Sequence, residues 1–209
     1  MKDPDFIHRF VSATNDGGAT RTLFLLHGTG GDENDLLSLG RAIDPDAALL
    51  SPRGKVLENG APRFFRRLAE GVFDEADVIA RARELGAFVT AAIAHYKIDQ
   101  EKLIAIGYSN GANIAAAMIL LGVAAFRQAI LLRAMVPLSD FEPDVGSQRR
   151  ILISNGRIDP IAQPENSERL AELLRKTGAE VDLIFQSGGH GLLPNDIAAS
   201  QQWLAAGEP

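Results

Sequence analysis

Hydrophobic residues gather along the chain in short continuous runs, and longer segments of helical periodicity separate these runs. Each run ends in or near a glycine, proline or polar residue, which is typical of strands buried on both faces of a sheet. We predict strands in six segments: Arg21–Gly28, Asp46–Gly54, Lys102–Ser109, Gln128–Pro137, Arg149–Asp159 and Glu180–His190. A further segment, Asp5–Thr14, precedes a polar turn and is predicted to be an antiparallel edge strand.

Helices are predicted between the strands. Apolar residues recur at steps of three and four over Asp74–Tyr96, and acidic residues open Asp32–Ile43, as suits a helix N-terminus. The other predicted helices cover Ala112–Gly122, Pro164–Gly178 and Pro194–Gly207. This alternation predicts an α/β fold with a mainly parallel, doubly wound sheet and helices on both faces. Because the 209 residues contain no repeat and no linker, we expect one domain over residues 1–209.

One segment, Ser51–Phe73, matches neither pattern. It is too long and too aromatic for a simple connection, and long loops after parallel strands commonly build binding sites. Arg53, Phe64, Phe65 and Arg66 are therefore candidates for an aromatic wall and a cation that contact an anionic or phenolic ligand. In the alternative, Arg66 and Arg67 pair with Glu70 or Asp74, and the phenylalanines pack beneath the loop. The sequence favours neither interpretation.

The pentapeptide "GYSNG" at positions 107–111 places Ser109 between two glycines, after a predicted strand and before a predicted helix. A G-x-S-x-G sequence in this context forms a sharp turn that exposes the serine hydroxyl as a nucleophile. Glycine is needed at both ends because a Cβ there would meet neighbouring backbone. The alternative is that Ser109 is an ordinary helix N-cap.

A serine nucleophile needs a base, and the base needs a group that orients it. His190 is the candidate base because it lies in a glycine-flanked loop after the last predicted strand. Asp159 ends the preceding strand at the sheet edge that carries Ser109, and it is the candidate acid. Asp140 and Asp144, which follow an earlier strand, are the competing acids.

The remaining candidates for these roles receive structural interpretations. His8 is expected at the surface of the edge strand, and His95 is expected to be partly exposed near a helix C-terminus. His27 ends the first core strand. Asp182 lies inside the last strand pattern and is expected to be exposed.

The glycine-rich loop "HGTGGDEND" at positions 27–35 follows the first core strand. An oxyanion needs two backbone donors, and we predict them to be the N–H groups of Thr29 in this loop and of Asn110 after Ser109. A phosphate-binding loop is the alternative. It is disfavoured because the loop lacks both G-x-G-x-x-G spacing and a P-loop lysine, and acidic residues follow it.

Composition narrows the class of protein. The chain has no cysteine, which removes disulfides and thiolate chemistry, and its net charge of −6 disfavours nucleic-acid and anionic-membrane partners. The first ten residues lack an apolar leader pattern, and the longest apolar run, Ile114–Ala125, contains Gly122 and is too short to span a bilayer. We therefore expect a cytoplasmic protein.

The motifs "LLHGTGGDENDLL", "SPRGKVLENGAPRFFRRLAEGVFDEADV", "AIGYSNGANIAAAMI", "ILISNGRIDPI" and "GGHGL" together carry a family resemblance from about residue 22 to the final helix. The chain resembles the bacterial carboxylesterase/phospholipase family of small α/β-hydrolases, and most closely its hydroquinone-inducible, dioxygenase-associated predicted esterases. The resemblance implies an α/β-hydrolase fold without a separate cap domain. It also implies a serine esterase that acts on small, short-chain esters without a metal or cofactor and that often forms a homodimer.

The same resemblance implies roles for individual residues. Ser109 would be the nucleophile, His190 the general base and acid, and Asp159 the orienting acid; Thr29 and Asn110 would form the oxyanion hole. His27 would brace the oxyanion loop. Related dienelactone hydrolases carry cysteine at the position of Ser109, which makes that activity doubtful for this chain. Two alternatives remain, an acyl-thioesterase or lysophospholipase and a ligand-binding α/β-hydrolase with little activity.

Overall fold

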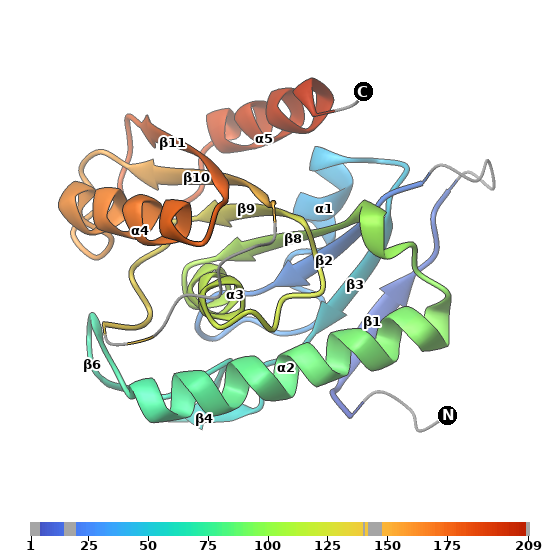
Figure 1. Ribbon diagram of the computed structural model, residues 1–209, viewed down its shortest axis with the longest axis horizontal. Helices are drawn as coiled ribbons and strands as arrows, with labels where there is room; N and C mark the ends of the chain where they lie inside the picture. Colours follow the sequence, from blue (N-terminus) through green and yellow to red (C-terminus); the bar gives the residue numbers. More distant parts are fainter. Residues whose placement is uncertain (1–4, 15–19, 140, 142–147, 208–209) are drawn as a thin grey trace.

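A central sheet of seven strands organises the chain in the computed structural model, which describes residues 5–14, 20–139, 141 and 148–207 (Figure 1). The strand order is β1-β3-β2-β8-β9-β10-β11, with β1 antiparallel to β3 and every other neighbouring pair parallel. The strands are β1 (His8–Val11), β2 (Thr22–Leu26), β3 (Ala48–Pro52), β8 (Leu103–Tyr108), β9 (Gln128–Leu132), β10 (Arg150–Gly156) and β11 (Glu180–Gln186). The mainly parallel sheet and its antiparallel edge strand confirm the prediction.

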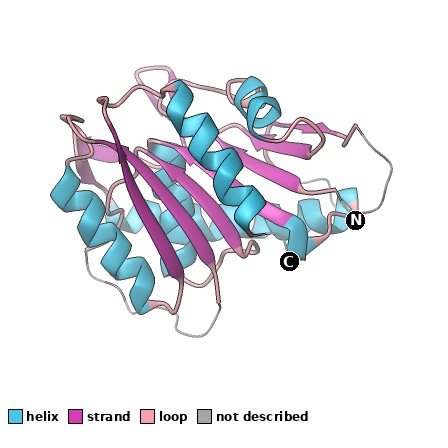
Figure 2. Cartoon of the chain, turned by 90° about the horizontal axis from the view of Figure 1, so that it is seen from above, coloured by secondary structure: helices cyan, strands magenta, loops and turns pink. Residues whose placement is uncertain are grey.

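Helices cover both faces of this sheet (Figure 2). One face carries α2 (Glu75–Tyr96), α3 (Asn110–Leu120) and α4 (Pro164–Lys176), and the other carries α1 (Leu37–Ile43) and α5 (Pro194–Ala206). A short 3-10 helix, Gln100–Lys102, leads into β8.

The pleat of β2 divides its side chains between two cores. All five residues of the strand are buried. Phe24 and Leu26 pack into the cluster beneath α2 and α3, whereas Leu23 and Leu25 pack into the cluster beneath α1 and α5. Because successive strand residues point to opposite faces, a doubly covered strand must be apolar throughout. This explains the continuous hydrophobic run in the sequence.

The first predicted helix begins later than expected. Residues 33–36 form turns, and α1 starts at Leu37 with no acidic residue in its first turn. The Asp32 side chain instead accepts a hydrogen bond from the backbone N–H of Asn34 at 2.8 Å, and Glu33 pairs with Arg53. Asp32 and Glu33 therefore stabilise the loop through side-chain contacts. In the sequence, acidic residues that stabilise a loop look the same as acidic residues that open a helix, so the helix start was predicted too early.

The segment Ser51–Phe73 folds into two small antiparallel hairpins after the end of β3. The first pairs β4 (Val56–Glu58) with β5 (Ala61–Arg63), and the second pairs β6 (Arg67–Ala69) with β7 (Val72–Phe73). A long loop was expected here, and the structure corrects this.

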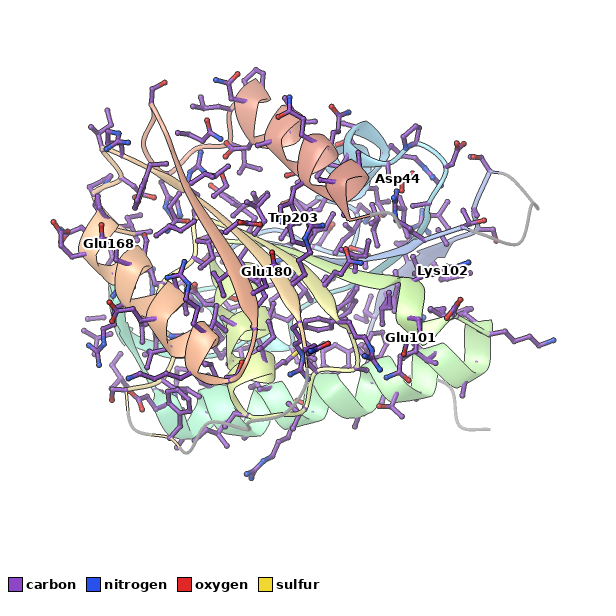
Figure 3. The ribbon with its side chains drawn as sticks, turned by 45° about the horizontal axis from the view of Figure 1, so that its top comes forward. Asp44, Glu101, Lys102, Glu168, Glu180 and Trp203 are labelled. Atoms are coloured by element: carbon purple, nitrogen blue, oxygen red, sulfur yellow. The ribbon has the colours of Figure 1, made fainter. Side chains whose placement is uncertain are left out.

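The last helix packs through Trp203, which Figure 3 labels on α5. Its indole N–H donates to Asp182 Oδ2 at 2.7 Å, and the Arg150 guanidinium lies 4.1 Å from its ring centroid. This contact leaves Asp182 half-buried, so the prediction that Asp182 is exposed is wrong. Within the described part of the chain, no helix is long and apolar enough to cross a membrane.

Candidate active site

The turn between β8 and α3 holds Ser109 in a conformation that non-glycine residues rarely adopt, with φ of 52°. A Cβ on Gly111 would lie 1.9 Å from the Leu26 carbonyl oxygen, and one on Gly107 would lie 2.6 Å from the Ala112 backbone nitrogen. The two glycines therefore provide the steric clearance predicted for a nucleophile turn. The Ser109 hydroxyl makes no capping hydrogen bond to α3, which argues against the N-cap alternative.

The structure brings Ser109, His190 and Asp159 together from three separate strand ends. His190 Nε2 lies 2.9 Å from Ser109 Oγ, and His190 Nδ1 lies 2.8 Å from Asp159 Oδ2. The Asp159 side chain is fully buried, and its other oxygen accepts backbone hydrogen bonds from Ile161 and Ala162. Both carboxylate oxygens are thus occupied, which fixes the carboxylate behind the imidazole. The competing acids, Asp140 and Asp144, lie outside the described residues.

A buried arginine holds the loop that carries His190. Arg133 is fully buried, has φ of 57°, and forms a bidentate ion pair with Asp196. Its guanidinium also donates to the carbonyl oxygens of Gly189 at 2.9 Å and Gly191 at 2.8 Å, on either side of the histidine. These further hydrogen bonds compensate the free-energy cost of burying the Arg133–Asp196 ion pair.

The His190 carbonyl oxygen itself accepts a hydrogen bond from the Tyr108 hydroxyl at 3.1 Å. Three successive carbonyls of the histidine loop are therefore fixed by side chains. Sequence reasoning missed Arg133, which stands at the end of β9 in an otherwise apolar segment. A single charged residue in this apolar segment was the one sequence feature that could have indicated a structural role for Arg133.

The two predicted oxyanion donors line the same cavity as Ser109 and are braced by one short strand. Along β5 and just after it, the Pro62 carbonyl accepts from Gly30 N–H at 2.9 Å and the Phe64 N–H donates to Asn110 Oδ1 at 2.7 Å. Between them, Arg63 Nη1 donates to Thr29 Oγ1 at 2.6 Å. Three consecutive residues thus connect the loops of both donors.

His27 braces this arrangement from beneath. Its Nε2 accepts the backbone N–H of Gly54 at 2.9 Å, so its Nδ1 carries the proton and donates to the Gly28 carbonyl at 2.6 Å. Burial lowers the pKa of His27 below its ordinary value of 6.5, against the opposing effects of the Gly28 carbonyl and nearby Asp35, Asp32 and Glu33. His27 is therefore a neutral, structural histidine.

The other two histidines lie away from Ser109. His8 is half-buried, and its Nε2 is 2.7 Å from the Tyr96 hydroxyl. His95 is exposed in the last turn of α2.

A cavity of about 250 Å³ opens in front of Ser109. Its walls include the predicted residues Thr29, Asn110 and His190. The hairpin segment adds further lining residues that the sequence did not single out: Arg63, Arg67, Glu70, Gly71 and Phe73.

The four predicted ligand-contacting residues of the hairpin segment do not line this cavity, and that prediction is corrected. Phe64 and Phe65 are buried in the core beneath α2, and Arg66 pairs on the surface with Asp74. Arg53 pairs with Glu33, and this guanidinium lowers the pKa of the Glu33 carboxyl. The structural alternative is therefore correct for Phe64, Phe65 and Arg66. It is wrong for Arg67, which pairs with Glu58 and lines the cavity together with Arg63.

Comparisons with known proteins agree with the fold and motifs. No family model matches the chain. A protein of Bacillus subtilis (strain 168) named as a hydrolase, MhqD, is 47% identical over 188 residues, which are 90% of this chain and 94% of the relative. A Bacillus cereus carboxylesterase structure is 41% identical with a TM-score of 0.91, covering 97% of this chain and 94% of its own. A Mesorhizobium loti carboxylesterase structure is 34% identical with a TM-score of 0.90, covering 98% and 97%.

The sheet, the strand-to-helix serine turn and these likenesses define an α/β-hydrolase. The chain belongs to the family of bacterial carboxylesterases that includes the B. cereus enzyme and the MhqD hydrolase, which confirms the resemblance deduced from its motifs.

Proposed function

We propose that the chain is a serine carboxylesterase that cleaves small carboxylic esters through an acyl-enzyme intermediate. The observation that carries the proposal is the continuous relay from Ser109 Oγ to His190 Nε2 and from His190 Nδ1 to Asp159, at 2.9 and 2.8 Å. The relay faces a cavity of about 250 Å³, which suits a small substrate. The names of the related carboxylesterases support the same reaction class.

Acylation begins when Ser109 Oγ attacks the ester carbonyl carbon and His190 Nε2 accepts the hydroxyl proton. The carbonyl electron pair moves to oxygen, and the backbone N–H groups of Thr29 and Asn110 stabilise the oxyanion. The tetrahedral intermediate then expels the alcohol, which takes the proton from His190 and leaves the acyl group on Ser109. Asp159 stabilises the imidazolium throughout.

Deacylation repeats these steps with water. His190 accepts a proton from the water molecule as its oxygen attacks the acyl carbon, and the second tetrahedral intermediate releases the carboxylic acid. Ser109 Oγ leaves and regains its proton from His190, so the enzyme returns to its starting state.

Replacement of the nucleophile tests the proposal. Ser109→Ala is expected to keep the fold and to lower kcat for 4-nitrophenyl acetate by at least about 10⁴-fold, because no other group replaces the nucleophile. Circular dichroism checks the fold. Ser139→Ala is the matched control, because this exposed hydroxyl bonds Glu75 outside the cavity. Full activity of Ser109→Ala would overturn the proposal.

Two other functions are outcomes of the same assays. A chain-length series of oxygen esters and thioesters separates a carboxylesterase from an acyl-thioesterase or lysophospholipase, and the cavity volume favours the shortest acyl groups. A ligand-binding α/β-hydrolase would turn over these esters slowly or not at all. We also propose that the protein is cytoplasmic and forms a homodimer. Cell fractionation tests the location, and analytical ultracentrifugation tests the oligomeric state.

A further inference from the structure

We infer that the substrate of this site is an ester that also carries a carboxylate, bound by the guanidinium groups of Arg63 and Arg67. The inference rests on the proposed esterase function and narrows it to a chemical class, the short half-esters of dicarboxylic acids and esters of hydroxy acids. It concerns residues that neither the serine turn nor the histidine loop contains.

Both arginines lie in the wall of the cavity that exposes Ser109 and His190. Arg63 ends β5 in the first hairpin and Arg67 begins β6 in the second, so two separate elements direct cations to one place. The Arg63 side chain is only 3% exposed, whereas that of Arg67 is 32% exposed. A buried guanidinium in the wall of an ester pocket is costly unless anions or acceptors surround it.

The local charge is incompletely balanced. One carboxylate, Glu58, serves both arginines: its Oε1 lies 2.9 Å from Arg67 Nε and its Oε2 lies 3.2 Å from Arg63 Nε. Two cations share one anion. Burial lowers the pKa of Arg63, Glu58 opposes this effect, and Arg67 lowers the pKa further. Glu70 also lines the cavity but is exposed, and among the described residues it forms no ion pair with either arginine.

The cavity wall also has unused hydrogen-bond donors. Arg63 uses Nε toward the Phe65 carbonyl and Nη1 toward Thr29, and no described residue accepts from its Nη2. Arg67 uses only Nε, so both of its terminal nitrogens lack a protein acceptor among the described residues. The buried Nδ2 of Asn110, another lining residue, likewise has no acceptor in the part of the chain that the structure describes, while its Oδ1 accepts from Phe64 N–H.

A carboxylate is the ligand that meets these conditions. It supplies the missing negative charge, and its two oxygens accept from several N–H groups in the planar geometry that guanidinium favours. A neutral acyl group of the same size would cover these donors without accepting hydrogen bonds from them, which is unfavourable. With a volume of about 250 Å³, the cavity restricts such substrates to a few carbons on either side of the ester.

The carboxylate can lie on the acyl or on the alcohol part of the ester, and two matched substrate pairs separate these cases. Monomethyl succinate is compared with methyl levulinate, which replaces the carboxylate by a methyl ketone. Acetoxyacetate is compared with acetoxyacetone in the same way. The hydrolysis of each ester is measured by pH-stat titration. For each pair, kcat/KM for the anionic ester is divided by kcat/KM for the neutral ester.

We expect this ratio to be about 10 in the wild-type enzyme for at least one pair, because hydrogen bonds to a charged group contribute an effect of this size. Arg67→Gln is expected to lower that ratio about tenfold, and Arg67→Lys is expected to retain part of it because the charge remains. Arg66→Gln is the matched control: Arg66 is the neighbouring arginine, pairs with Asp74 and lies outside the cavity, so the ratio should not change.

The outcomes distinguish this inference from the function on which it rests. Hydrolysis of the neutral esters with wild-type ratios at or below one for both pairs, or a ratio unchanged in Arg67→Gln, overturns the carboxylate site alone. If no ester is hydrolysed and a fluorophosphonate does not react at Ser109, the esterase proposal fails and the inference fails with it. Circular dichroism of each variant excludes misfolding as the cause of a changed ratio.

Discussion

Two regions border the same cavity and are built in different ways. The loops at the carboxyl ends of β8, β10 and β11 hold Ser109, Asp159 and His190 through buried contacts and close backbone approach. The hairpins over residues 56–73 have strands of two or three residues and expose Leu57, Leu68 and Val72. The proposed catalytic groups therefore depend on the core of the sheet, whereas the charges that would select a substrate lie on small peripheral elements.

The largest effect is expected from the strand-end region. Asp159→Asn should lower kcat for 4-nitrophenyl acetate by about 10⁴-fold, because an amide at this position favours the wrong tautomer of His190. Asp140→Asn is the matched control and should retain activity. If the two variants exchanged these results, the assignment of the acid would be wrong.

A single type of substitution compares the two regions directly. Gly111→Ala places a Cβ 1.9 Å from the Leu26 carbonyl oxygen, so we expect a loss of at least about 3 kcal/mol in the free energy of unfolding. Gly60→Ala, in the first hairpin, meets no atom of the described residues within 4 Å, but φ is 84° there, so we expect a loss of only about 1–2 kcal/mol. Urea unfolding measures both. Equal losses would contradict the distinction between the two regions.

Arg133 tests how far the histidine loop depends on its buried clamp. Arg133→Lys keeps the charge but not the fork that holds the Gly189 and Gly191 carbonyls, so kcat should fall about 10- to 100-fold with little change in KM. Arg149→Lys alters a buried arginine at the opposite end of the sheet and should affect stability without lowering kcat. A comparable fall in kcat in both variants would show that Arg133 has only a general structural role.

The smallest effect concerns pH. Because the pKa of His27 is lowered by burial, the unfolded chain binds more protons than the folded chain below about pH 6.5. The free energy of unfolding should therefore fall as the pH drops through 6.5 and level off below the folded pKa. His27→Gln should flatten this dependence in urea unfolding measured from pH 8 to pH 5. An unchanged slope would mean that His27 does not carry the effect.

The sheet and the triad candidates were predictable because each is encoded locally. The central strands β2, β8 and β9 are largely apolar runs, and Ser109, Asp159 and His190 each follow a predicted strand in a short polar motif. Parallel strands bring their carboxyl ends to one edge, so sequence order alone predicted that these three residues meet.

The hairpin segment was not predictable in the same way. Side chains on a strand alternate between faces, so a shift of one residue in register reverses which side chains reach the cavity. The cations were expected at Arg53 and Arg66, and the structure places Arg63 and Arg67 there instead. Arg133 depends on Asp196, 63 residues later in the chain, and no local pattern encodes that pairing.

The most direct test of the central claim is labelling of the folded enzyme with a fluorophosphonate probe, followed by peptide mass spectrometry. Only a serine activated by a neighbouring base reacts readily with such a probe. The account predicts one modified residue, Ser109, with loss of esterase activity in proportion to labelling and no labelling in His190→Gln. Modification of a different residue, or full activity after Ser109 is labelled, would contradict it.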